Sequence, residues 1–142
     1  PGFRERLNRY ASQCLTVDDF QATIEIDATL NLTELNDASV AQVLSLAPFG
    51  CGNAAPSFAV LDAELAGPVS AGEKLVRIPI RQNGRTLFLK SWNSAERWQE
   101  LGPGARIDLA ISLEEDSYSA ARGYPGWCAI VKDFRRIASA VA

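Results

Sequence analysis

Residues 74–92 read Lys-Leu-Val-Arg-Ile-Pro-Ile-Arg-Gln-Asn-Gly-Arg-Thr-Leu-Phe-Leu-Lys-Ser-Trp, and this stretch decides the fold. Its two runs, 74–81 and 85–92, carry apolar side chains at alternate positions, which is typical of strands with one face in a core. Between them lies Asn83-Gly84, the dipeptide that most strongly favours a two-residue turn between antiparallel strands. The stretch therefore predicts a β-hairpin.

Three further segments carry a β pattern, and one carries a helical pattern. Residues 58–66, 105–114 and 127–137 predict strands, and residues 94–101 predict a short helix with Ser94 as its N-cap. The resulting order, β-β-β-α-β-β, is that of an oligonucleotide/oligosaccharide-binding (OB) barrel. We therefore expect a mainly β chain, a five-stranded OB-fold Greek-key barrel preceded by short N-terminal helical and extended segments.

The residues before the barrel have a different pattern. Residues 3–14 place apolar side chains at helical spacing, residues 23–27 alternate as in a short strand or extended linker, and Asn36 predicts the N-cap of a helix over about 37–46. We expect three parts: residues 1–22 as the helical tail of a preceding domain plus a linker, 23–56 as a strand-helix-turn connector, and 57–138 as the barrel.

The composition limits both the location and the chemistry. The 142 residues are 47% hydrophobic and 22% charged, enough for a buried core. No apolar run approaches the ~18 residues of a membrane span and no leader opens the chain, so we expect a cytoplasmic protein without membrane contact. The chain contains no Met and begins with Pro1, as expected of a piece of a longer protein.

Two residue counts exclude whole classes of site. There is no His, which excludes imidazole catalysis, Ser-His-Asp and Cys-His nucleophiles, and His-based metal sites. Cys14, Cys51 and Cys128 are widely spaced and odd in number, so we expect buried or idle thiols rather than zinc ligands or disulfides. We expect no catalytic residue and no metal site in this chain.

The Asn83-Gly84 turn also fixes which side chains share a face of the hairpin. Its register places Arg77 opposite Lys90, and alternation then separates an inner face from an outer one. The inner set is Val76, Ile78, Ile80, Leu87 and Leu89. The outer set is Arg77, Arg81, Phe88, Lys90 and Trp92.

The outer set suits single-stranded nucleic acid, because bases stack on aromatic rings and cations follow the phosphates. The same fold usually binds its ligand on this face. Since the net charge of the chain is −3, any such surface must be a local patch. The alternative is that Phe88 and Trp92 pack against a neighbouring domain.

A second candidate set lies in the loop over 115–126, where Tyr118, Arg122 and Tyr124 stand beside Glu114, Glu115 and Asp116. The acids would repel phosphate, so an ordinary solvated loop is the competing interpretation.

Residues 46–58 carry a resemblance to a known family. The segment Leu-Ala-Pro-Phe-Gly-Cys-Gly-Asn-Ala-Ala-Pro-Ser-Phe, preceded by Ile26-Asp27-Ala28, resembles the turn that leads into the OB domain of RecJ-type single-stranded-DNA-specific exonucleases. Ala54 departs from the family pattern, which usually has Pro there. The residues that carry the motif are Pro48, Phe49, Gly50, Gly52, Asn53 and Pro56. We expect them to form a structural elbow between helix and barrel, with a backbone N–H cluster that binds phosphate as the alternative.

The resemblance implies more than the residues show. Enzymes of this family degrade single-stranded DNA from the 5′ end in recombination and repair, with Asp and His ligands for Mn²⁺ or Mg²⁺ in a DHH-type core. This chain has none of those motifs. We therefore expect an accessory domain that has no catalytic activity, needs no cofactor of its own and binds single-stranded DNA. The expected partners are single-stranded DNA, the remaining domains of the parent exonuclease and other repair proteins. The alternative is a structural or docking module that closes the domain arrangement around the nuclease core.

Overall fold

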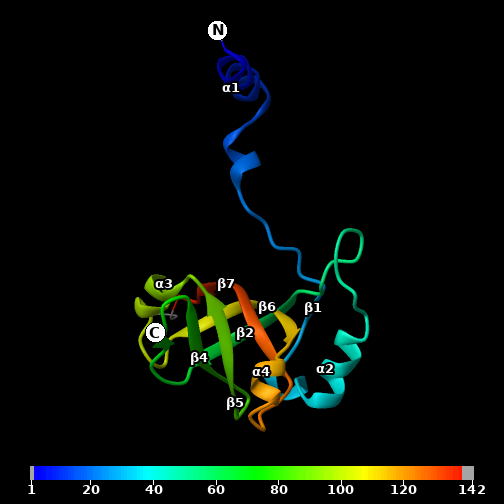
Figure 1. Cartoon of the computed structure of the whole chain (residues 1–142). Coiled ribbons are helices and arrows are strands. Elements are labelled where there is room, and N and C mark those ends of the chain that lie inside the picture. Colours follow the sequence, from blue (N-terminus) through cyan, green and yellow to red (C-terminus); the bar gives the residue numbers. More distant parts are fainter. Residues whose placement is uncertain (1, 139–142) are drawn as a thin grey trace.

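A closed five-stranded barrel is the main body of the structure (Figure 1). In this computed structural model, which describes residues 2–138, Pro1 of the predicted 1–22 segment lies outside the described residues. The barrel strands are β2 (Phe58–Leu65), β4 (Leu75–Gln82), β5 (Arg85–Trp92), β6 (Arg106–Glu115) and β7 (Trp127–Arg136). They pair in the order β2-β6-β7-β5-β4, and a β2–β4 pairing closes the barrel. Helix α3 (Ala95–Gln99) joins β5 to β6, so the predicted order is confirmed.

Two short strands extend the sheet beyond the barrel. Strand β1 (Ala28–Thr29) runs parallel to β2, and β3 (Ser70–Ala71) pairs with β4. The alternating residues 23–27 are not part of a strand, and pairing starts only at Ala28. Asp27 holds this start in place: its N–H donates to the carbonyl of Ser57 at 2.8 Å, and its carboxylate accepts from the Ser57 N–H at 2.8 Å.

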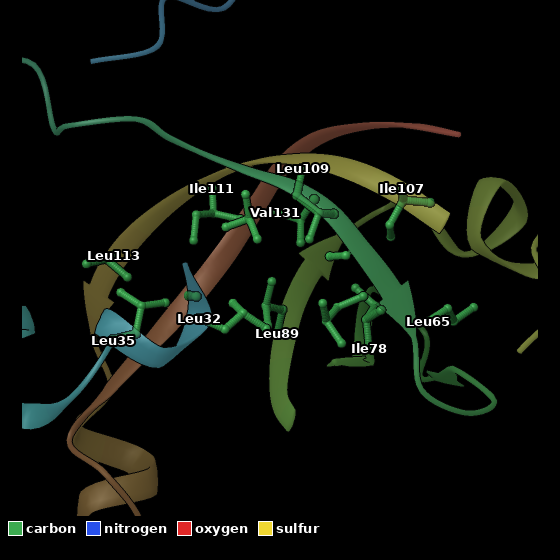
Figure 2. Packing of buried hydrophobic residues seen from close by; sticks show 14 of the residues in the cluster. Leu32, Leu35, Leu65, Ile78, Leu89, Ile107, Leu109, Ile111, Leu113 and Val131 are labelled. Atoms are coloured by element: carbon green, nitrogen blue, oxygen red, sulfur yellow. The ribbon is translucent and has the colours of Figure 1, made fainter. Parts of the chain in front are cut away.

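The predicted connector supplies part of the barrel core. Leu32 and Leu35 lie in and just after the 3₁₀ turn η2 (Leu32–Glu34), Val40 lies in α2 (Asp37–Leu44), and all three are buried in the same cluster as the strand residues. Figure 2 shows Leu32 and Leu35 among side chains of the strands. Asn36 caps α2 as predicted, accepting from the N–H groups of Ala38 and Ser39. The boundary near residue 56 stays a prediction, but residues before it complete the core.

Helix α3, which follows β5, contributes Trp98 to the barrel core. Trp98 of α3 is completely buried, and its ring stacks on Phe134 with the centroids 3.9 Å apart. Ser94 precedes this helix as predicted, yet its hydroxyl lies 2.6 Å from that of Ser91 and makes no cap.

The N-terminal residues form an arm. Helix α1 (Phe3–Cys14) has the predicted bounds, and the 3₁₀ turn η1 (Val17–Phe20) follows it. Neither contains a buried residue, and Figure 1 shows α1 away from the barrel. No helix within residues 2–138 has the length and apolarity to cross a membrane.

The three cysteines are free thiols and form no disulfide, in line with the expectation of buried or idle thiols rather than disulfides. Cys14 and Cys51 are exposed, and Cys128 is half-buried. Burial raises the pKa of the Cys128 thiol above its ordinary value.

Candidate nucleic-acid interface

The β4–β5 hairpin has the register that its turn predicts. Arg77 pairs with Lys90, Pro79 with Phe88 and Arg81 with Thr86. Asn83 and Gly84 have φ values of 50° and 79°, the left-handed geometry that a two-residue hairpin turn requires. Four of the five predicted inner residues are buried and Leu87 is half-buried against the core. The outer side chains therefore share one face, as predicted.

Phe88 and Trp92 present their rings to solvent. Phe88 is 62% exposed and Trp92 is 53% exposed, which is high for such large apolar side chains. The two residues are four positions apart on one strand, which sets them about 13 Å from each other. The guanidinium carbon of Arg77 lies 5.4 Å from the centre of the Phe88 ring, within reach of a cation–π contact. No ion pair recorded for residues 2–138 involves Arg77.

Arg81 lies on the same face but has a carboxylate partner. Its Nη2 is 2.6 Å from Oε1 of Glu64, which sits directly across from it on β2. The Arg81 side chain is 50% exposed, so the pair is screened by water and contributes little to stability. Arg81 is thus paired with Glu64, and its predicted contact with phosphate stays a prediction.

Lys90 also has a carboxylate partner, and this one is buried. Its Nζ donates to Oδ2 of Asp116 at 2.6 Å, with the lysine side chain 22% exposed and the aspartate 8% exposed. The hydroxyl of Ser119 donates to the same oxygen at 2.6 Å, and the Ser119 N–H donates to Oδ1 at 3.1 Å. These donors hold the pKa of Asp116 at about 2, chiefly through the Lys90 and Ser119 side chains.

The loop after Asp116 contains a helical turn that the sequence did not predict. Helix α4 (Ser117–Ala120) begins at Asp116, whose carboxylate caps it. Tyr118 and Tyr124 are each 67% exposed. Arg122 folds back so that its guanidinium carbon lies 3.5 Å from the centre of the Tyr118 ring, and its Nη1 donates to the Tyr118 carbonyl at 3.1 Å.

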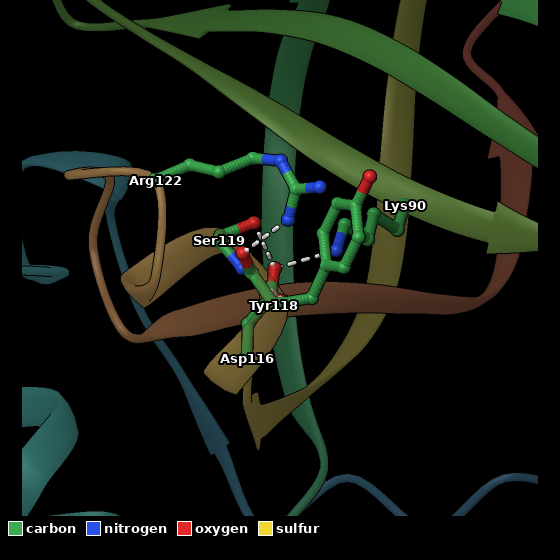
Figure 3. A network of polar contacts seen from close by, with 5 residues as sticks. All are labelled: Lys90, Asp116, Tyr118, Ser119 and Arg122. Carbon is green, nitrogen blue, oxygen red and sulfur yellow. Dashed lines mark hydrogen bonds and ion pairs between the residues drawn. The ribbon is translucent and has the colours of Figure 1, made fainter.

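The two predicted sets are therefore joined. Figure 3 shows the Asp116 carboxylate bonded both to Lys90 of β5 and to Ser119 of the loop that carries Tyr118 and Arg122. Sequence reasoning treated Asp116 as a source of repulsion and missed Ser119. The signal available was an Asp before a short polar run, a common N-cap pattern.

The motif residues of the turn make a separate feature. Gly50 and Asn53 exchange two backbone hydrogen bonds of 2.9 and 3.1 Å. The Asn53 amide also donates to the carbonyls of Leu46 and Pro48. Gly52 has a φ of 80°, which favours glycine, whereas Phe49 and Pro56 are half-buried.

This turn is bonded within itself, and it is not brought to the β4–β5 face. Because the N–H groups of Gly50 and Asn53 are already used, fewer remain to bind phosphate than the alternative required. Helix α2 is also joined to the barrel by the indole N–H of Trp127, which donates to Asp37 at 2.8 Å. The role of the turn as a structural elbow stays a prediction.

Comparison with known proteins identifies the family. Residues 26–124, more than half of the chain, match the RecJ OB domain family. The chain belongs to the RecJ OB domain family. A relative of this family, the single-stranded-DNA-specific exonuclease RecJ of Bacillus subtilis (strain 168), is 31% identical over 119 residues, and the match covers 81% of this chain. The match spans only 15% of the length of that relative.

Two solved structures are also similar to this chain. A proposed aspartyl-tRNA synthetase from Leishmania major Friedlin is similar over 96% of this chain and 26% of its own, with a TM-score of 0.50 and 9% identity. A replication protein A heterotrimer bound to single-stranded DNA is similar over 57% of each chain, with a TM-score of 0.43 and 9% identity. At such identities the likeness concerns the fold alone.

Proposed function

We propose that this RecJ OB domain is a single-stranded-DNA-binding module of a RecJ-like 5′ to 3′ exonuclease that acts in recombination and repair in the cytoplasm. The observation that carries the proposal is the outer face of β4 and β5. There two exposed rings, Phe88 and Trp92, share a face with Arg77. Lys90 of the same face is joined through Asp116 to the loop that carries the Tyr118–Arg122 stack. Strand face plus adjoining loop is the surface with which OB folds bind oligonucleotides.

The contacts favour stacking over charge as the main source of affinity. Base-on-aromatic stacking contributes about 1–3 kcal/mol per base in proteins that bind single strands. Of the cations on the face, Lys90 and Arg81 have carboxylate partners, which leaves Arg77 and Arg122. Two phosphate contacts predict a salt slope of about −1.4 for a single strand.

The test is a fluorescence-anisotropy titration with labelled oligo-dT of about 10 and 20 nucleotides, lengths that span the known OB site sizes. The double variant Phe88→Ala/Trp92→Ala removes both rings of the face. A matched control, Phe3→Ala/Phe20→Ala, removes two rings of the arm that are 74% and 73% exposed. Binding should be lost in the first variant and kept in the second. If Phe88→Ala/Trp92→Ala binds oligo-dT as tightly as the wild type, the binding site lies elsewhere.

A second candidate function is a structural or docking module that closes the domain arrangement around a nuclease core. It is favoured by the ion pairs of Lys90 and Arg81, which leave a more apolar outer face around Phe88 and Trp92. This role predicts no oligo-dT binding at low salt and binding of the remaining RecJ domains that weakens in Phe88→Ala/Trp92→Ala. Other repair proteins are candidate partners in the same role.

We propose that strand cleavage, with its Mn²⁺ or Mg²⁺, belongs to a part of the RecJ-like enzyme that this chain does not include, and that this domain needs no cofactor. The chain has no His, and residues 2–138 hold no cluster of three or more acidic or cysteine side chains that fits such an ion. Incubation with labelled single-stranded DNA and either metal should leave the DNA intact. Metal-dependent cleavage by the purified chain would contradict the proposal.

A further inference from the structure

Asp116 lies in a surface proposed to bind DNA, although its negative charge repels phosphate. Among residues 2–138 it is the one charged side chain that is buried, at 8% exposure. Burying a carboxylate is costly unless it is paired and hydrogen-bonded, and Asp116 is both. An exposed loop carboxylate is solvated by water, whereas Asp116 is buried and bonded to protein donors, so we infer that it has a structural role in this loop.

The contacts of Asp116 join two elements that are distant in sequence. On one side, Oδ2 accepts from Lys90 of β5. On the other, both oxygens accept from Ser119 in α4, one from its hydroxyl and one from its N–H. The carboxylate therefore links the strand that carries Phe88 to the turn that carries Tyr118.

The rest of the loop is built on that link. The N–H of Ala120 donates to the carbonyl of Asp116, and those of Arg122 and Tyr124 both donate to the carbonyl of Ser119. Arg122 in turn lies over the Tyr118 ring. Movement of Asp116 would therefore displace the stack as a whole.

We propose that Lys90 and Asp116 are positioning residues: their ion pair holds the Tyr118–Arg122 stack beside strand β5, so that this acid promotes single-stranded-DNA binding. The inference rests on the proposed function and changes the role of Lys90 within it. Lys90 acts through Asp116 on the loop, and the phosphates are contacted by Arg77 and Arg122.

The sign of one substitution separates this role from direct contact. If Lys90 touched phosphate and Asp116 only opposed it, Asp116→Asn would remove a repelling charge, release the lysine and raise affinity for DNA. If the pair positions the loop, Asp116→Asn lowers affinity, because Tyr118 and Arg122 must then be ordered on binding. Ordering two free side chains predicts a loss of about tenfold.

The chain offers a matched control for the charge. Glu115→Gln removes the same charge one residue away, from a side chain that is exposed and for which residues 2–138 provide no hydrogen bond or ion pair. This variant should bind equally well or slightly more tightly. Lys90→Met should resemble Asp116→Asn, and Lys90→Arg should restore binding because it keeps the pair.

The experiment combines oligo-dT titration with hydrogen exchange on the 142-residue chain. We expect Asp116→Asn and Lys90→Met to speed amide exchange at residues 119–124 more than in β6 and to weaken binding, with the circular dichroism unchanged. Tighter binding by Asp116→Asn, or exchange in the loop equal to wild type, would overturn the proposal. If the wild type itself fails to bind, the proposed function fails, and the exchange data alone then decide whether the pair holds the loop.

Discussion

Leu32→Ala tests whether residues before the predicted barrel boundary belong to the folding unit. Leu32 is fully buried, although it lies in the predicted connector. The N–H of Leu32 donates to Oε1 of Gln82 at 2.8 Å, and the substitution keeps this bond because it involves only the backbone of residue 32. The variant therefore removes packing alone.

The expected loss follows from the side chain removed. Leu→Ala deletes three buried carbons, which is about 2.4 kcal/mol of transfer free energy at ~0.8 kcal/mol each. A cavity term adds to this, because η2 is fixed by that hydrogen bond and by Leu35 and cannot collapse freely. We expect a loss of about 3 kcal/mol in the free energy of unfolding, or roughly 10 °C in Tm.

Urea denaturation followed by tryptophan fluorescence measures this directly, since Trp98 is fully buried in the same core. Leu46→Ala is the matched control, because Leu46 is 58% exposed and lies outside the core. Its free energy of unfolding should stay within about 0.5 kcal/mol of wild type. A loss below about 1 kcal/mol for Leu32→Ala would refute the packing of the connector into the barrel.

Three further predictions concern charges and the α2 tie. Arg77→Ala should reduce the salt slope of oligo-dT binding by about 0.7, the contribution of one phosphate contact on a single strand. Arg81→Ala should leave the slope unchanged because Glu64 already neutralises that charge, and titrations at several salt concentrations compare the two variants. The pKa of Asp116, about 2 against an ordinary 3.8, means that its contribution to stability is present above about pH 4 and is lost as the pH falls through 2. Wild type should therefore exceed Asp116→Asn by about 2 kcal/mol in urea unfolding at pH 7, and this difference should shrink in acid. Asp37→Ala should cost about 1 kcal/mol by loss of the Trp127 hydrogen bond, and a redshift of tryptophan emission without global unfolding would accompany it; an unchanged free energy of unfolding would show that this bond does not hold α2.

Local rules explain why the hairpin could be predicted in detail. The left-handed turn at Asn83-Gly84 admits one register, and alternation then assigns every side chain of β4 and β5 to a face. The helix after Asn36 follows equally from its cap. These features depend on residues close in sequence.

The remaining features depend on contacts between distant residues. The partners of the outer cations, Glu64 for Arg81 and Asp116 for Lys90, are 17 and 26 positions away, so no local pattern reveals them. The packing of Leu32 and Val40 into the barrel is likewise set by the closure of the sheet. Sequence reasoning found the right face and loop but could not show how an acid joins them.

The most direct test of the account is quenching of tryptophan emission by oligo-dT. Of the three tryptophans, Trp92 is exposed on the proposed face, Trp98 is buried and Trp127 is half-buried. If bases stack on the β4–β5 face, oligo-dT should quench the emission of the wild type and of Trp127→Phe, and the quenching should be lost in Trp92→Phe. Quenching that persists unchanged in Trp92→Phe, or none in the wild type at low salt, would contradict single-stranded-DNA binding on this face.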